Sequence, residues 1–110
     1  MRHARKPARV REEDSETPYM TRRAMDFIAQ AGDAPWCLHL SYIKPHWPYV
    51  APAPYNAMYS KADLIPVVRS QDERRDAHPV FAEFMEHRVA RSFSRDDVRE
   101  EVAPVYMGLI

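Results

Sequence analysis

The sequence is short of glycine, cysteine and net charge, and each shortage excludes a class of protein. Only two of its 110 residues are glycine, too few for the glycine-rich loops that cradle nucleotide phosphates. Its single cysteine, Cys37, excludes an internal disulfide and a cysteine-based metal cluster. Sixteen basic and sixteen acidic residues cancel to a formal charge of zero. This argues against general nucleic-acid binding, because phosphate contacts need clustered positive charge.

Long apolar runs are also absent. No stretch approaches the ~20 apolar residues that span a bilayer, and the amino terminus has no apolar core of a secretory signal. We therefore expect a cytoplasmic protein that engages neither a membrane nor nucleic acid. Residues 1–14 carry five lysines and arginines before the first acid, Glu12, and we expect them to form a disordered basic arm.

Helical spacing is clearest over residues 18–31. Apolar side chains recur there every three or four residues, at Met20, Ala24, Phe27, Ile28 and Ala31. Thr17 and Pro18 suit the N-cap and the first helical position, and Gly32 suits the carboxyl-terminal stop. The pattern predicts a helix over residues 18–31.

Residues 36–43 predict a buried strand. The run is apolar except for His39 and Ser41, and a near-continuous apolar run of this length is typical of a parallel strand covered on both faces. Cys37 lies within the run and is expected to be a buried, inert thiol. Helix, short loop and strand together indicate an α/β fold, as half of a βαβ unit.

The rest of the chain alternates irregular and helical patterns. Five of the ten prolines lie between Pro35 and Pro54, which favours stiff, extended backbone. Residues 57–78 have no clean period and predict a long loop. Pro79 opens a second predicted helix, with one side made of Phe81, Phe84, Met85 and Arg88.

A third helix is predicted near the end of the sequence. Ser94 and Asp97 resemble a capping box at its start. Its apolar stripe consists of Val98, Val102, Val105 and Leu109. Pro104 falls within this helix and is expected to break or kink it.

Lys44 and His46 follow the predicted strand, where open α/β sheets bind ligands. An imidazole, with an ordinary pKa of about 6.5, can give or take a proton at neutral pH. A neighbouring lysine suits an anionic ester, because the cation binds the oxyanion while the imidazole handles the leaving group. Pro45 and Pro48 stiffen the loop. Spacing alone decides little, since a lone histidine near a turn is more often structural or exposed.

Residues 40–49, Leu-Ser-Tyr-Ile-Lys-Pro-His-Trp-Pro-Tyr, add a family resemblance. They resemble the segment after a central strand in sulfatases and phosphonate monoester hydrolases of the alkaline phosphatase superfamily. The pattern there is an apolar strand, a histidine and a proline two residues on, often with Lys-Pro before the histidine. Residues 48–55 are most similar to the phosphonate monoester hydrolase branch. The first helix and residues 106–110 are also similar, so the resemblance covers most of residues 15–110.

The resemblance implies both a fold and an activity. Residues 15–110 would be the central portion of an α/β/α sandwich, with one central strand, flanking helices and a long loop. The complete enzymes would be metal-dependent hydrolases of sulfate, phosphate or phosphonate monoesters and diesters, acting on small anionic substrates. They use a divalent metal ion (Ca, Mg or Mn) and a formylglycine nucleophile. The histidine that matches His46 assists the leaving group, and Lys44 and His46 are expected to bind the substrate.

The sequence also departs from the family pattern. The nucleophile motif (Cys or Ser, then Pro or Ala two residues on, then Arg) is absent, and Cys37 is followed instead by Leu38-His39-Leu40-Ser41. The acidic metal pairs are absent too, and Asp96-Asp97 suits a helix start. We therefore expect an internal fragment without metal ligands, inactive alone and self-associating through exposed sheet edges.

Two alternatives without catalysis stay open. In the first, the basic arm and the Trp/Tyr-rich loop bind an anionic polymer, and a salt-dependent shift on nucleic acid or heparin would favour it. In the second, the chain is a small interaction protein that completes another protein's sheet. A cooperatively folded, soluble monomer would favour this second alternative.

Overall fold

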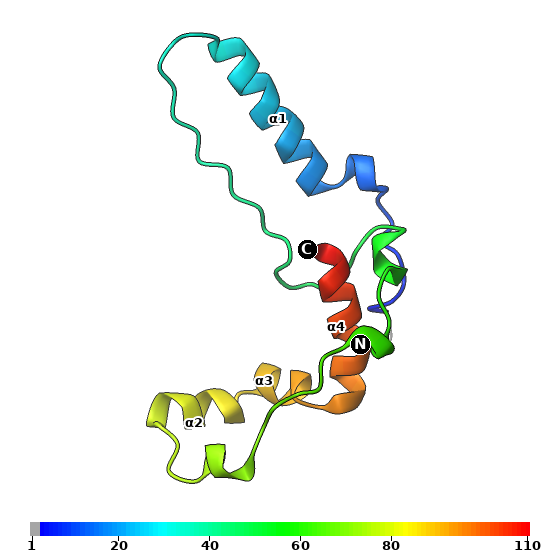
Figure 1. Cartoon of the computed structure of the whole chain (residues 1–110), viewed down its shortest axis with the longest axis vertical. Helices are drawn as coiled ribbons and strands as arrows, with labels where there is room; N and C mark the ends of the chain where they lie inside the picture. Colours follow the sequence, from blue (N-terminus) through cyan, green and yellow to red (C-terminus); the bar gives the residue numbers. More distant parts are fainter. Residues whose placement is uncertain (1–2) are drawn as a thin grey trace.

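The computed structural model describes residues 3–110, and their regular structure is entirely helical (Figure 1). The α-helices are α1 (Glu16–Ala31), α2 (Pro79–Glu86), α3 (Arg88–Phe93) and α4 (Asp96–Leu109). The 3-10 turns are η1 (Glu12–Asp14), η2 (Tyr55–Ala57), η3 (Lys61–Asp63) and η4 (Gln71–Arg74). Residues 1–2 of the predicted arm lie outside the described residues. None of the described helices has the length and apolar character needed to cross a bilayer.

The molecule is elongated. It measures 58 × 32 × 22 Å and has a radius of gyration of 18.8 Å, whereas a compact chain of this length has about 13 Å. Figure 1 shows α1 at one end, α2 and α3 at the other, and α4 between them. An elongated chain buries few side chains, so its folding depends on a small number of contacts.

The predicted helix over residues 18–31 is confirmed as α1 and begins two residues earlier. Ser15, rather than Thr17, occupies the N-cap position, with extended backbone angles. Gly32 ends the helix at φ +55°, a left-handed conformation that glycine adopts without strain. Its N–H donates to the Ile28 carbonyl at 3.3 Å.

The predicted strand over residues 36–43 is wrong, and with it the α/β fold class. Within residues 3–110 no strand forms, and this segment is an irregular, extended run beside α1 (Figure 1). Trp36 meets Phe27 edge-to-face with ring centroids 6.2 Å apart, and the Tyr42 hydroxyl lies 2.7 Å from that of Thr21.

A missing backbone partner explains the error. A strand needs a neighbouring strand to pair its N–H and C=O groups, and an apolar pattern does not reveal whether one is present. Without that partner the run stays open to solvent, with Trp36 48% and Ile43 63% exposed. Cys37, expected to be buried, is exposed as well.

The small core forms where α4 meets η2 and the residues before it. Val102 (4% exposed), Val105 (0%) and Ala51 (0%) lie there, which confirms the predicted valine stripe. The expected break at Pro104 does not occur, because α4 is continuous from Asp96 to Leu109. Packing rather than propensity therefore keeps residues 102–109 helical.

Residues 3–14 run along the segment that contains η2. The Ala8 N–H donates to the Ala51 carbonyl at 2.8 Å, and the buried Asn56 amide donates to the Arg5 carbonyl at 2.8 Å. The Tyr55 hydroxyl donates to the Glu12 carboxylate at 2.7 Å, and this hydrogen bond raises the pKa of the phenol. These contacts join the amino-terminal segment to the core of α4.

The helix predicted to open at Pro79 is confirmed as α2, but it is shorter than the apolar pattern suggests. It stops at Glu86, and His87 adopts an extended conformation before α3 begins. Arg88 therefore belongs to α3 rather than to the face of α2.

The predicted Ser94–Asp97 capping box is wrong. Ser94 has helical backbone angles at the end of α3, so its hydroxyl donates back to the Arg91 carbonyl at 3.0 Å. Arg95 precedes α4 instead, without a side-chain cap.

A capping arrangement that the sequence analysis missed lies at η3. Asp63 accepts hydrogen bonds from the Ser60 backbone N–H at 2.7 Å and from the Ser60 hydroxyl at 2.8 Å, and these lower the pKa of Asp63 from its ordinary 3.8. A lowered carboxyl pKa contributes stability above 3.8 that is lost as the pH falls through the folded value.

We expect Ser60→Ala to move the pKa of Asp63 part of the way back toward 3.8, because the hydroxyl donor is lost while the backbone donor remains. NMR titration of the Asp63 carboxyl measures this. Ser70→Ala is the matched control. The Ser70 hydroxyl accepts from the Asp72 N–H at 3.0 Å, as the Ser60 hydroxyl accepts from the Ala62 N–H at 3.2 Å, but within the described chain it does not bind a carboxylate. Identical Asp63 titrations in wild type and Ser60→Ala would contradict the prediction.

Candidate functional site

His46 lies on a tight turn after the extended segment. The His46 N–H donates to the Ile43 carbonyl at 2.8 Å, and Pro45 and Pro48 fix their own φ angles on either side. The peptide bonds before both prolines are cis. The ring is exposed, and its Nδ1 lies a long 3.4 Å from the Trp47 carbonyl. The turn thus presents an imidazole that is weakly engaged by the protein.

His46 borders a hollow of about 1380 Å³ between this turn, the segment around η4, and helices α2 and α3. Aromatic rings dominate its walls: Trp47, Tyr49, Phe81, Phe84 and Phe93. Tyr49 meets Phe93 edge-to-face at 5.5 Å and Tyr106 of α4 at 5.9 Å. These ring contacts fix the turn against α3 and α4, so the position of His46 relative to the hollow depends on them.

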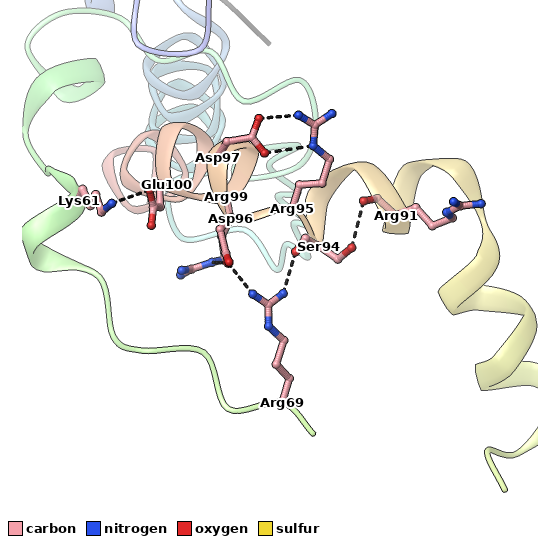
Figure 2. A network of polar contacts seen from close by, with 9 residues as sticks. All are labelled: Lys61, Arg69, Arg91, Ser94, Arg95, Asp96, Asp97, Arg99 and Glu100. Atoms are coloured by element: carbon pink, nitrogen blue, oxygen red, sulfur yellow. Dashed lines mark hydrogen bonds and ion pairs between the residues drawn. The ribbon is translucent and has the colours of Figure 1, made fainter. Parts of the chain in front are cut away.

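Arg69 borders the hollow, and Figure 2 shows its guanidinium between Ser94 and Asp96. Its guanidinium donates to the Ser94 carbonyl at 2.7 Å and pairs with Asp96 at 2.5 Å. Arg99 approaches the same Asp96 oxygen at 3.8 Å. Arg69 therefore joins the irregular segment before η4 to the junction of α3 and α4, which lies about 25 residues further along the chain.

Further ion pairs surround the start of α4 (Figure 2). Arg95 binds Asp97 through two hydrogen bonds, and this contact lowers the pKa of Asp97. Lys61 of η3 pairs with Glu100 at 2.7 Å. Each exposed pair contributes little to stability alone. The Lys61–Glu100 pair links η3 to α4, whereas the Arg95–Asp97 pair is local to the start of α4.

Lys44 lies elsewhere. It borders a second hollow, of about 570 Å³, between the start of α1, the η2 region and the end of α4. The structure therefore places the two predicted site residues at different hollows. That both contact one substrate stays a prediction.

The described residues do not fit the metal or the formylglycine implied by the resemblance. Across residues 3–110 no three His, Cys, Asp or Glu side chains are grouped so as to bind a metal ion. Asp96 and Asp97 are engaged by arginines, and Cys37 is exposed on the extended segment. We therefore derive no chemical step through either group.

Most of the residues that border the hollow beside His46 are not recognisable from the sequence. Arg69 carried no signal, because only the fold brings it to the start of α4. Phe81 and Phe84 were recognised as one helical face, but spacing could not show that this face borders the turn of His46.

The chain is 36% identical over 84 residues to the multifunctional alkaline phosphatase superfamily protein PehA of Trinickia caryophylli. Its structure matches the phosphonate monoester hydrolase SpPMH from Silicibacter pomeroyi with a TM-score of 0.75 and 32% identity. The chain is a relative of the phosphonate monoester hydrolases of the alkaline phosphatase superfamily. No protein-family model matches it.

The extent of these matches is uneven. They cover 74% and 96% of this chain but only 16% of PehA and 23% of the Silicibacter pomeroyi enzyme. The chain thus spans less than a quarter of the length of either relative. The resemblance to phosphonate monoester hydrolases is confirmed, and the activity of a whole enzyme is a matter for proposal.

Proposed function

We propose that the chain corresponds to an internal section of a hydrolase that cleaves phosphonate, phosphate or sulfate esters, with His46 beside the leaving-group oxygen. The observation that carries the proposal is the exposed imidazole on a proline-stiffened turn at the edge of a large hollow. The relation to phosphonate monoester hydrolases supports the reaction class.

The chemistry assigned to His46 is proton transfer. When an ester bond to phosphorus or sulfur breaks, negative charge collects on the departing oxygen, and a nearby N–H lowers the barrier by donating its proton. The contact of Nδ1 with the Trp47 carbonyl is long, and Nε2 makes no hydrogen bond within the described chain. Nε2 is therefore the atom we assign to the leaving group.

The nucleophile and the metal ion would come from parts of a larger protein other than residues 3–110. We therefore propose that the isolated chain does not turn over esters. Its contribution would be to position the imidazole and to form one wall of the substrate site.

The test is an exchange of segments. The matching section of the Silicibacter pomeroyi enzyme is replaced by residues 15–110, and hydrolysis of aryl phosphonate monoesters is measured. We expect the chimera to be active. Within it, His46→Ala should lower kcat about 10²–10⁴-fold. The loss should grow as the leaving group becomes more basic, because a poor leaving group needs the proton more.

His39→Ala is the matched control, since His39 is also exposed but does not border the hollow. It is expected to change kcat less than threefold. A folded chimera that is inactive would contradict the assignment of the section, and an active one indifferent to His46→Ala would contradict the role of the imidazole.

A further inference from the structure

The hollow beside His46 has an apolar side that the proposed proton transfer does not use. Phe81 (46% exposed) and Phe84 (63% exposed) project from α2, and Trp47 (62% exposed) projects from the turn of His46. Exposed rings gathered around one hollow are a typical lining for the organic part of a ligand. The imidazole at the edge leaves this side free for the group attached to the ester oxygen.

The charges around the same hollow are mostly positive. Three arginines and one carboxylate, Glu73, border it. Arg69 is paired with Asp96, and Arg74 lies 3.7 Å from Glu86. Arg88, at the start of α3, is the arginine on this wall whose guanidinium has no ion pair or hydrogen bond within residues 3–110.

We propose that the hollow binds the organic group of the ester and that Arg88 selects organic groups carrying a negative charge of their own. This rests on the proposed function, since it takes His46 to mark the reacting end. The ligand class is an apolar, flat group with a carboxylate or sulfonate substituent. Guanidinium suits such an anion because it donates two parallel hydrogen bonds to a planar or tetrahedral oxyanion.

Charge complementarity decides between this ligand and a neutral one. A purely apolar group would contact the aromatic rings alone. The unpaired guanidinium of Arg88 would make no favourable contact with such a group. An apolar anion uses both features, because the rings contact its flat apolar part while the guanidinium pairs with its charged substituent.

The test uses the 110-residue chain and two fluorescent probes that differ in charge. 8-Anilinonaphthalene-1-sulfonate is the anionic probe, and N-phenyl-1-naphthylamine is its neutral counterpart. Arg88→Gln is expected to raise the Kd of the anionic probe about tenfold, which corresponds to the loss of one charge-assisted contact. The Kd of the neutral probe should change less than twofold. Arg88→Lys, which keeps the charge, should restore part of the loss.

Two further variants complete the design. Arg9→Gln removes an exposed arginine outside the hollow and is expected to leave both affinities unchanged. Phe84→Ala should weaken both probes, which places them in the hollow. Circular dichroism of each variant shows whether the helices persist.

The outcomes separate cleanly. An anionic probe that binds wild type and Arg88→Gln equally overturns the proposal, and so does an equal loss of both probes, which indicates packing rather than charge. Binding of both probes that falls as protein concentration rises also overturns it, because the hollow is then filled by a second copy of the chain. None of these results depends on catalysis. The proton-transfer role of His46 is tested separately, by the exchange of segments.

Discussion

Gly108→Ala is expected to weaken the contact between α4 and η2 by up to about 2 kcal/mol, although the helix itself prefers alanine. Alanine is favoured over glycine inside a helix by about 1 kcal/mol. A Cβ at residue 108, however, would lie 2.1 Å from the Tyr55 carbonyl oxygen and 3.0 Å from its carbon. These are backbone atoms that cannot rotate aside, and overpacking of this kind costs about 1–3 kcal/mol. The steric term is the larger, so the sign of the effect is destabilising.

Hydrogen exchange of the α4 amides measures the change, because it reports local opening even where unfolding is not cooperative. Protection over residues 102–108 should fall about tenfold in Gly108→Ala. Ala103→Gly, in the same helix, calibrates the propensity term alone. Protection that rises in Gly108→Ala would show that α4 and η2 do not approach as closely as the structure has them.

The helices were predictable because their signals are local. The apolar spacing of α1, the proline that opens α2 and the valine stripe of α4 are each contained within a few turns of chain. The end of α2 was not predictable, because no residue near His87 forbids a longer helix. The predicted Ser94 cap was wrong for a related reason. The Ser94 hydroxyl can bind a backbone group of either neighbouring helix, and the helical backbone angles of Ser94 direct it to α3.

The predicted strand and the hollow beside His46 depend on contacts between distant residues, which local sequence patterns do not reveal. An apolar run such as residues 36–43 predicts burial without showing which element would bury it. Here the run is open to solvent, so the fold class inferred from it was wrong. The motif around His46 nevertheless pointed to the relation with phosphonate monoester hydrolases, because that inference depended on the order of side chains and not on backbone pairing. The arginines of the hollow were beyond reach, since Arg69 meets Ser94 and Asp96 only through the fold.

The chain exposes more surface than a compact protein of its mass. The chain exposes 9038 Å², whereas a compact protein of 12.9 kDa exposes about 6,300 Å². The difference is comparable to the area that obligate protein interfaces bury, roughly 2,000–5,000 Å². Stability should therefore be unevenly distributed, highest where α4 packs and lowest along the extended segment.

We expect the backbone amides of residues 36–43 to exchange within about tenfold of the unfolded rate, while those of residues 102–108 are protected at least a hundredfold more. The reason is that no N–H of residues 36–43 has a hydrogen-bond acceptor in the described chain. By contrast, α4 is helical throughout and packs against the core, and only Pro104 within it lacks an N–H. Native-state exchange followed by NMR or mass spectrometry measures both segments in one experiment. A dilution series is the control: protection of residues 36–43 that disappears on dilution reports pairing between copies. Protection that persists at every concentration would mean that these amides find acceptors within one chain, and the unpaired, extended segment would then be the wrong description of this part of the molecule.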